Sequence, residues 1–370
     1  MMVLQGKGFY IWRIKDCERG NAIDISSVAQ AAGLSHVLIK VADGAYTYNY
    51  DRNQRLDLVP PVANALRSMG IQVWGWQYVY GDYPSNEASI AVQRVNDLHL
   101  DGFVVDVEDQ YEDPSKKTAA KTYMRELRSG IGNNIPIALS SYRFPSLHPI
   151  PWNEFLEKCD INMPQVYWMG AHNPGSQLTR TLHEFENMTY QRPIIPTGAA
   201  YMERGWAPTL QDIQEFLISA KSANLTAANF WEWRNCREVL MPNHQIWNVI
   251  ANFEWSGGSN PPQDITGQLI EALNSRNTNV LADLYADRAV HVTSDRTIIG
   301  RDKILSWYHT FFNQHLPNGI FFLSGYSGTG NSRHLTWTAQ STAGKVNDGN
   351  DTLGLINDKI TYHYTYFTVS

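Results

Sequence analysis

The chain has 370 residues, of which 43% are hydrophobic and 18% are charged, and its formal net charge is −6. This length exceeds the roughly 250–300 residues at which a single core stops growing, so two domains are expected. A negative net charge offers nucleic acid no overall attraction, and no run approaches the about 20 apolar residues of a membrane span. We therefore expect neither nucleic acid nor a membrane as a partner. The opening MMVLQGKGFYIW lacks a signal-peptide pattern, so a cytoplasmic location is the default expectation.

From residue 8 to residue 255, short β-branched or aromatic runs alternate eight times with segments of helical periodicity. This alternation is typical of a parallel sheet with crossover helices. The expected strands are 8–14, 36–42, 71–81, 101–108, 135–141, 160–168, 192–200 and 227–233, and the segments 58–70 and 208–223 are typical of the helices between them. No GxGxxG follows the first strand, which disfavours a doubly wound open sheet. The sequence predicts an α/β fold with a closed (β/α)₈ TIM barrel over residues 1–255.

The stretch SGGSNPPQ, residues 256–263, lacks periodicity and is typical of an interdomain linker. Beyond it, residues 264–370 place helices before strands, which indicates an α+β domain. The expected helices are 264–275, 279–289 and 300–312, and the expected strands are 290–293, 334–344, 351–358 and 359–369. In the last strand, alternation puts Ile360, Tyr362, Tyr364 and Tyr366 on one face.

The element order of this second domain and its segments IIGRDKI and DKITYHYTYFTV resemble the SnoaL-like, nuclear transport factor 2-like family. The resemblance implies a cone-shaped, cystatin-like α+β domain. Such cones serve as enzymes, as binding pockets or as dimerisation modules, so a homodimer through this domain is one expectation. A small-molecule pocket is another, lined by the three tyrosines of the last strand together with Trp307 and Trp337.

Two carboxylates end the fourth expected strand, DGFVVDVE. Side chains alternate along a strand, so Val104, Asp106 and Glu108 share one face while the apolar Phe103 and Val105 share the other. The apolar set is expected to face the helices, which directs the two acids into the barrel mouth, where barrel enzymes keep their active sites. Burial and mutual repulsion separate the pKa values of such a pair, leaving an acid beside a base, as glycosidic bond cleavage requires. A solvated strand end is the structural alternative.

Three segments make the barrel similar to glycoside hydrolase family 25, the lysozyme-like muramidases: AGLSHVLIKVADG, IQVWGWQYVYG and VVDVE. The resemblance implies that Glu108 is the catalytic acid and Asp106 the assisting carboxylate. The sequence departs from the family at the first strand, where Tyr10 takes the place of an aspartate. The eighth-strand aspartate is also missing, although Glu232 supplies a carboxylate nearby.

Further side chains near the expected strand ends are candidates for lining a sugar site. Amides and phenols hydrogen-bond sugar hydroxyls, and indole faces stack on the ring. The candidate substrate-binding residues are Tyr10, Lys40, Gln77, Tyr78, Gln165, Tyr167, Trp231, Glu232 and Trp233. Lys40 lies within a buried strand and needs an acidic partner, either Asp43 or Asp106. For each residue, core packing or a structural ion pair is the competing interpretation.

The three cysteines, Cys17, Cys159 and Cys236, are far apart, which predicts neither a disulfide framework nor a zinc cluster. The histidines lack metal-ligand spacing, and HExxH, GxSxG and P-loop motifs are absent from the sequence. We therefore expect no metal and no cofactor, and chemistry carried by carboxylates. The predicted function is hydrolysis of an O-glycosidic bond in an oligo- or polysaccharide. The alternatives are a non-catalytic carbohydrate-binding or scaffold protein and a small-molecule site in the second domain.

Overall fold

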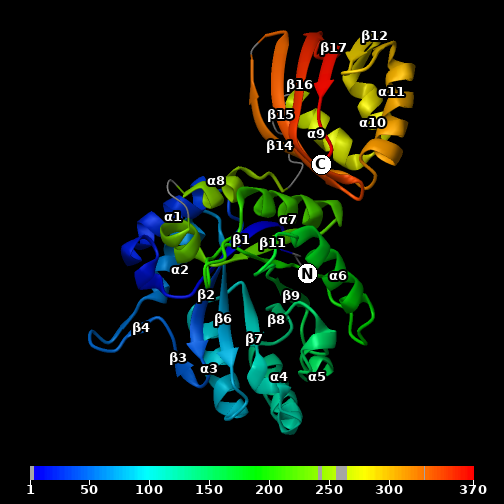
Figure 1. Ribbon diagram of the computed structural model, residues 1–370. Helices are drawn as coiled ribbons and strands as arrows, with labels where there is room; N and C mark the ends of the chain where they lie inside the picture. Colours follow the sequence, from blue (N-terminus) through cyan, green and yellow to red (C-terminus); the bar gives the residue numbers. More distant parts are fainter. Residues whose placement is uncertain (1–3, 241–243, 256–264, 329) are drawn as a thin grey trace. The chain divides into compact units, whose positions relative to one another are not determined.

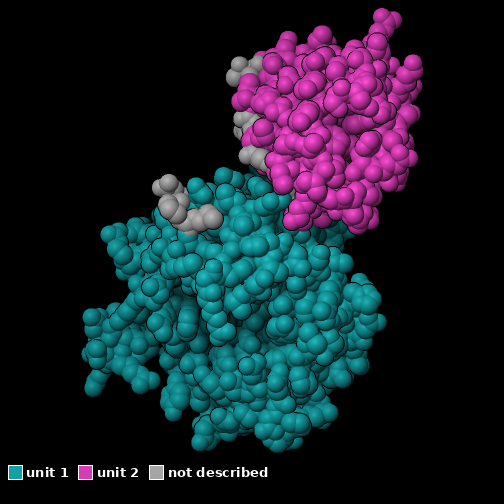
Figure 2. Space-filling view, in the orientation of Figure 1, with its two compact units in different colours: residues 1–256 teal, residues 257–370 magenta. Residues whose placement is uncertain are grey.

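The computed structural model describes residues 4–240, 244–255, 265–328 and 330–370. The chain divides into two compact units, Met1–Ser256 and Gly257–Ser370 (Figure 2). Each unit has its own hydrophobic core. The expected linker, 256–263, lies outside the described residues. Among the described residues, the helices fall short of the length and apolar character that crossing a membrane requires.

The first unit is a closed barrel of parallel strands (Figure 1). The strands run in the order β1-β11-β10-β9-β8-β7-β6-β2, and β1 pairs with β2 to close the ring. Their bounds are β1 Gly6–Ile11, β2 His36–Asp43, β6 Gln72–Val79, β7 Gly102–Val107, β8 Ile137–Tyr142, β9 Ile161–Val166, β10 Thr197–Ala199 and β11 Ala227–Trp231. This arrangement confirms the predicted closed ring of eight parallel strands.

Helices follow the strands and cover the outside of the ring (Figure 1). They are α1 Ala22–Ala31, α2 Val59–Ser68, α3 Pro84–Asp97, α4 Lys117–Ile131, α5 Trp152–Leu156, α6 Pro174–Glu186, α7 Leu210–Ser222 and α8 Gln245–Asn252. Helix α7 begins with a capping box, in which Thr209 accepts from the Asp212 N–H while the Asp212 carboxylate accepts from the Thr209 N–H. Such a box satisfies two otherwise unpaired donors and fixes where the helix begins.

Short elements follow several barrel strands. Strand β3 (Tyr46–Thr47) pairs with β2, and β4 (Tyr50–Asp51) pairs with β5 (Leu56–Asp57). The remaining helical turns are η1 Ile14–Asp16, η2 Glu18–Gly20, η3 Asp109–Glu112, η4 Pro114–Lys116, η5 Pro145–Leu147 and η6 Asn235–Val239.

Alternation along the strands produces two separate apolar layers in the first unit. Leu38, Trp74, Trp76 and Val104 belong to a small cluster inside the ring, together with Tyr10. The opposite faces of the same strands belong to the large cluster shared with the helices. The expected strand 192–200 is shorter than predicted, because β10 covers only Thr197–Ala199. Proline nitrogens at 193 and 196 lack the N–H that a sheet ladder requires.

In the part of the second unit that the structure describes, helices combine with a six-stranded mixed sheet of order β13-β12-β17-β16-β15-β14. Its elements are α9 Ile265–Ser275, α10 Thr278–Leu284, β12 Tyr285–Val292, β13 Thr297–Ile299, α11 Arg301–Thr310, η8 Phe311–His315, β14 Ile320–Ser327, β15 Ser332–Ser341, β16 Gly344–Ile356 and β17 Lys359–Tyr366. Strands β14 to β17 form an antiparallel meander, and β12 pairs with β17 in parallel. These elements confirm an α+β arrangement for this part of the chain.

Two predictions for the second unit are wrong. The helix expected over 279–289 ends at Leu284, and the chain enters β12 at Tyr285, whose ring is buried in the core. In β17, the register with β16 shifts next to Ile360, so the alternation from Ile360 to Tyr362 is broken. As a result Ile360 is buried, whereas Tyr362 and Tyr366 are 42% and 43% exposed. The expected aromatic pocket facing Trp307 and Trp337 is therefore not formed by these tyrosines.

Candidate active site

The first unit contains a cavity of about 510 Å³ at the ends of its barrel strands. The cavity is lined by Tyr10, Trp12, Lys40, Trp76, Tyr78, Asp106, Glu108, Ser140, Gln165, Tyr167, Tyr201, Met202, Glu203, Trp231 and Asn235. Asp106 is contributed by β7, and Glu108 is the residue directly after Val107, the last of that strand. The structure therefore brings both predicted acids to one cavity, together with six of the nine candidate binding residues.

Gln165 on β9 joins the two acids. Its Nε2 atom donates to Glu108 Oε1 at 2.6 Å and to Asp106 Oδ1 at 3.0 Å. Because both oxygens accept from one nitrogen, they lie closer together than the roughly 6.5–9.5 Å that inverting glycosidases keep between their carboxyl groups. The two acids therefore act as one coupled pair.

Burial raises the pKa values of both acids above their usual range. Asp106 is 8% exposed, and burial raises its pKa. Hydrogen bonds from Ser140 and Gln165 and the charge of Lys40 partly offset this increase. For Glu108, burial and the charge of Asp106 both raise the pKa, and they outweigh the opposing effects of Gln165 and His148. The charged surroundings of the two acids differ, because Lys40 and Ser140 favour the ionised form of Asp106 whereas the charge of Asp106 disfavours the ionised form of Glu108. The pair can therefore hold one proton on Glu108 beside an ionised Asp106.

Lys40 lines the same cavity and is surrounded by aromatic rings. Its Nζ atom is 3.0 Å from Asp43 Oδ1, so Asp43 is its ion-pair partner, as one of the two sequence alternatives expected. The ammonium group lies 4.8 Å from the ring centroid of Trp76 and 4.5 Å from that of Tyr48. Cation–π contacts of this kind compensate part of the desolvation of a buried ammonium group. The field of Lys40 also favours the ionised form of Asp106.

Aromatic rings form one wall of the cavity. The Trp231 centroid lies 5.6 Å from that of Tyr10, 5.4 Å from that of Trp76 and 6.2 Å from that of Trp12. Tyr10 is 3% exposed, and burial beside Asp106 raises the pKa of its phenol. Tyr10 is therefore a neutral packing group beneath the acids, and Trp12, which is 39% exposed, is the ring available for stacking.

Two further tyrosines complete the predicted lining. The Tyr78 hydroxyl donates to Gln110 Oε1 at 2.5 Å, and burial together with Glu108 raises the pKa of that phenol. Tyr167 packs edge-on against Tyr201, with their centroids 5.3 Å apart. Burial keeps both phenols protonated at neutral pH, and the Tyr78 oxygen, whose proton is held by Gln110, can still accept a hydrogen bond in the cavity.

Three predicted binding residues lie outside the cavity. Gln77 is fully buried on the helix side of β6, where its amide donates to the carbonyls of Gly44 and Glu87 and accepts from the Tyr123 hydroxyl. The Glu232 carboxylate accepts hydrogen bonds from the backbone N–H and the side-chain amide of Asn235, the first residue of the helical turn η6. The carboxylate is therefore held at the start of that turn. These contacts leave no role for Gln77 or Glu232 in the cavity lining.

Trp233 also belongs to the helix side. Its ring packs against Phe9 and Trp247, and its Nε1 atom donates to Glu18. The expectation that the eighth strand presents Trp231, Glu232 and Trp233 to the site holds only for Trp231.

Sequence reasoning missed seven lining residues: Trp12, Trp76, Ser140, Tyr201, Met202, Glu203 and Asn235. Strict alternation identifies two of them. On β6, an inward Tyr78 requires an inward Trp76 and an outward Gln77, and on β8 an inward Ala138 requires an inward Ser140. The other five lie beyond the strand ends, where alternation makes no prediction.

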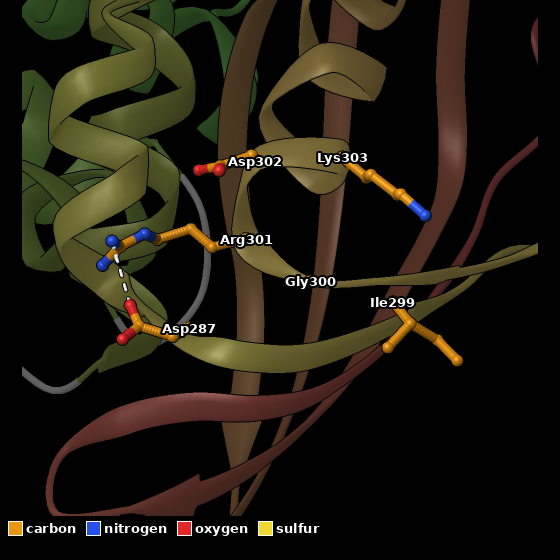
Figure 3. Close-up of a pocket in the computed structure, with 6 residues that line it drawn as sticks. All are labelled: Asp287, Ile299, Gly300, Arg301, Asp302 and Lys303. Carbon is orange, nitrogen blue, oxygen red and sulfur yellow. Dashed lines mark ion pairs between the residues drawn. The ribbon is translucent and has the colours of Figure 1, made fainter.

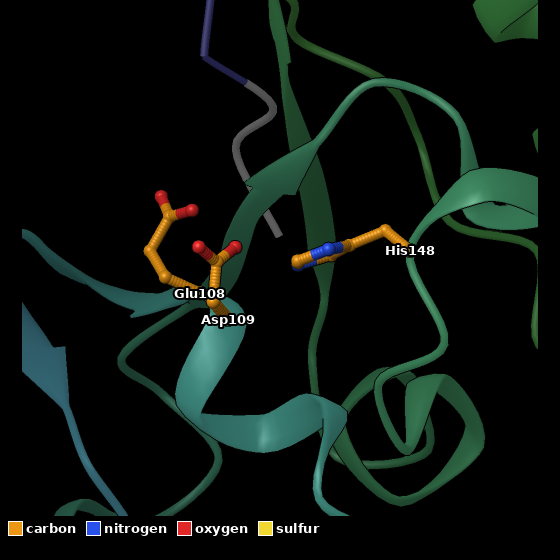
Figure 4. Close-up of side chains that lie close together, drawn as sticks. All are labelled: Glu108, Asp109 and His148. Carbon is orange, nitrogen blue, oxygen red and sulfur yellow. The ribbon is translucent and has the colours of Figure 1, made fainter.

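A grouping of possible metal ligands lies beside the acid pair. Glu108, Asp109 and His148 each offer a ligand atom, and these atoms lie within 4.8 Å of one another (Figure 4). Spacing along the chain gave no sign of it, because the loop after β8 supplies His148 while the end of β7 supplies the two acids.

The second unit has a shallow hollow of about 260 Å³ at the start of α11 (Figure 3). It is lined by Asp287, Ile299, Gly300, Arg301, Asp302 and Lys303. Arg301 Nη2 pairs with Asp287 Oδ1 at 2.9 Å, and both side chains are solvent-exposed. An exposed ion pair of this kind contributes little free energy, and none of the buried polar side chains lines the hollow.

Inside the second unit, polar side chains form a buried cluster. His363 Nε2 lies 3.2 Å from Asp351 Oδ2, and its Nδ1 lies 2.5 Å from the Tyr285 hydroxyl. The His291 ring stacks on His363 with centroids 4.6 Å apart. Burial lowers the pKa of His291 to about 2, so this imidazole is neutral. The register shift in β17 puts His363 in the core in place of the expected tyrosine face.

The first unit thus presents a class of site: a coupled carboxylate pair in an aromatic-lined cavity of a parallel barrel. No family model matches the chain, and none of the curated proteins does. Among solved structures, an NTF2-like protein of unknown function from Burkholderia xenovorans is 15% identical to this chain, with a TM-score of 0.26. The match covers 29% of this chain and 81% of the Burkholderia chain.

A protein assigned to the SnoaL-like family from Agrobacterium tumefaciens is 21% identical, with 28% of this chain and 94% of its own covered and a TM-score of 0.25. An NTF2-like protein of unknown function from Cytophaga hutchinsonii is 13% identical, with 30% and 95% covered and a TM-score of 0.26. TM-scores this low carry no argument about what this chain does.

Proposed function

We propose that the first unit is a glycoside hydrolase of the (β/α)₈ TIM-barrel type, similar to family 25, joined to a SnoaL-like cone. One observation carries the proposal: Asp106 and Glu108 share an aromatic-lined cavity, linked by Gln165, and burial beside Asp106 raises the pKa of Glu108. An acid beside a base on one cavity wall is the minimum that glycosidic cleavage requires. The expected substrate is an oligo- or polysaccharide containing an amino sugar.

In the proposed reaction, protonated Glu108 donates to the glycosidic oxygen as the bond from that oxygen to the anomeric carbon breaks. Ionised Asp106 is nearly buried and accepts from Gln165, so its role is to stabilise the developing positive charge and to orient the sugar's 2-acetamido N–H. The acetamido carbonyl oxygen then bonds to the anomeric carbon as an internal nucleophile. Water subsequently opens this ring, returning a proton to Glu108 and leaving the anomeric configuration retained.

The test is a panel of N-acetylated glycans assayed for new reducing ends with the wild-type chain and with Glu108→Gln. Glutamine keeps the shape of the side chain and removes the proton, so turnover is expected to fall about 10²–10⁴-fold while glycan binding persists. Glu203→Gln is a matched control at the rim of the cavity and is expected to change turnover much less. If the wild-type chain cleaves none of the panel, the proposal fails.

A specific observation favours one rival. Tyr10 fills the position of the first-strand aspartate, and Glu232 is held by Asn235, so both additional carboxylates of the resemblance are lost from the cavity. A carbohydrate-binding or scaffold protein, with a second unit that dimerises or binds a small molecule, would show this pattern. Glycan binding without cleavage, unchanged in Glu108→Gln, is the result that selects this rival.

A further inference from the structure

His148 is a buried histidine with one ring nitrogen unused. The residue is 4% exposed, and its Nε2 atom is buried without a hydrogen-bond partner among the described residues. Its Nδ1 atom lies 2.9 Å from Glu112 Oε1. A buried polar atom without a partner costs about 1–3 kcal/mol, which indicates that something absent from the protein chain completes this site.

The ring of His148 is held in one orientation. Its centroid lies 5.7 Å from that of Tyr142 and 6.2 Å from that of Trp152, and the Trp152 indole donates to the His148 carbonyl. The contact with Glu112 places a proton on Nδ1, so Nε2 is the ring nitrogen that can offer a lone pair to a ligand. A carboxylate that orients a histidine in this way is the usual support of a metal-binding imidazole.

Two carboxylates complete the arrangement. Glu108 and Asp109 offer oxygens that lie, together with a ring nitrogen of His148, within 4.8 Å of one another. Figure 4 shows the imidazole directed toward the two carboxyl groups. Ligand atoms about 2.0–2.2 Å from one ion in a tetrahedral arrangement lie about 3.3–3.6 Å apart, so side-chain movements of about an ångström close the site.

We propose that Glu108, Asp109 and His148 bind one divalent first-row metal ion, with Zn²⁺ as the best fit. One imidazole and two carboxylates suit Zn²⁺ better than Mg²⁺ or Ca²⁺, which take oxygen ligands alone. Three protein ligands leave a coordination position for water. The site shares Glu108 with the proposed general acid, so the bound ion takes the place of the proton on that carboxyl group. Metal binding therefore switches off the proposed hydrolase.

The test is isothermal titration of the tag-free, chelator-treated full chain with Zn²⁺ alone. Wild type is expected to bind one ion per chain, and Asp109→Asn and His148→Gln are expected to bind at least tenfold more weakly. Glu112→Gln, which contacts only the imidazole, is expected to lose about 10–100-fold. Asp97→Asn and His183→Gln make the same substitutions at exposed positions on α3 and α6, and are expected to keep wild-type affinity.

Asp109 is exposed, so Asp109→Asn is informative even if a substitution of the buried His148 unfolds the chain. Absence of one-to-one Zn²⁺ binding by wild type, or unchanged affinity in Asp109→Asn, would overturn the site. Calorimetry needs no turnover, so the metal site and the hydrolase stand or fall separately. If both are correct, Zn²⁺ inhibits hydrolysis by wild type at the concentrations that saturate the calorimetric site.

Discussion

The Nε2 atom of Gln165 lies 2.6 Å from Glu108 Oε1, and the same atom also donates to Asp106. Hydrogen bonds donated to a carboxylate favour its ionised form, so this amide holds both pKa values below the level that burial alone would produce. The Gln165 amide therefore limits how far burial can raise the pKa values of Asp106 and Glu108.

Gln165→Leu is expected to raise the pKa values of both acids, because leucine fills similar space and donates nothing. The shift is measurable from the carboxyl ¹³C resonances of the labelled full chain during a pH titration, without a substrate. Gln177→Leu, on the outer helix α6, is the matched control. A titration of Gln165→Leu that overlays wild type would show that the amide does not control the pair.

The proposed activity is expected to fall as pH rises through the raised pKa of Glu108, because the donor must be protonated. Asp106→Asn removes the neighbouring charge that raises this pKa. In Asp106→Asn, the alkaline limb of the kcat/KM profile should therefore move to lower pH, and turnover should also decrease because the positive transition state loses its counter-charge. An alkaline limb that stays in place would assign it to a group other than Glu108.

Glu108→Gln is expected to stabilise the first unit, and more so at alkaline pH. A carboxyl group whose folded-state pKa is raised contributes stability below its unfolded pKa and loses that contribution as pH rises through the folded pKa. Glutamine removes this loss. The gain in Tm over wild type should be small near pH 4.5 and should grow toward pH 8. For a unit of this size, each kcal/mol of added unfolding free energy raises Tm by about 2–4 °C. A constant or shrinking difference would contradict a raised pKa for Glu108.

Much of the first unit follows from sequence because its signals are local. Alternating strand and helix segments predicted the ring, and the spacing of Asp106 and Glu108 predicted that they share a face. Gln77 was misplaced because it neighbours the inward Tyr78, and alternation assigns only one residue of such a pair inward. Trp233 was misplaced because β11 ends at Trp231, so the alternation of the strand no longer applies at residue 233. His148 could not be predicted, since its meeting with Glu108 and Asp109 depends on how two loops fold together.

The second unit shows the limit of periodicity as a guide. A single register shift beside Ile360 moved the tyrosines of β17 outward and put His363 inside, and a sequence pattern carries no mark of such a bulge. The buried cluster around His363 is a result of pairing between strands that are distant in the chain.

This cluster gives the last prediction. Asp351 and His363 are each 2% exposed and lie 3.2 Å apart, and Asp351 also accepts from the Thr365 hydroxyl at 2.7 Å. Removing one partner of a buried hydrogen bond leaves the other partner unsatisfied, which costs about 1–3 kcal/mol. Asp351→Ala is therefore expected to lower the unfolding free energy of the second unit by that amount.

Asp287→Ala breaks the exposed pair with Arg301 and is expected to cost no more than about 1 kcal/mol. Urea denaturation of the two variants and wild type, followed by tryptophan fluorescence, measures the difference. Equal midpoints for the two variants would show that the buried cluster does not stabilise this unit.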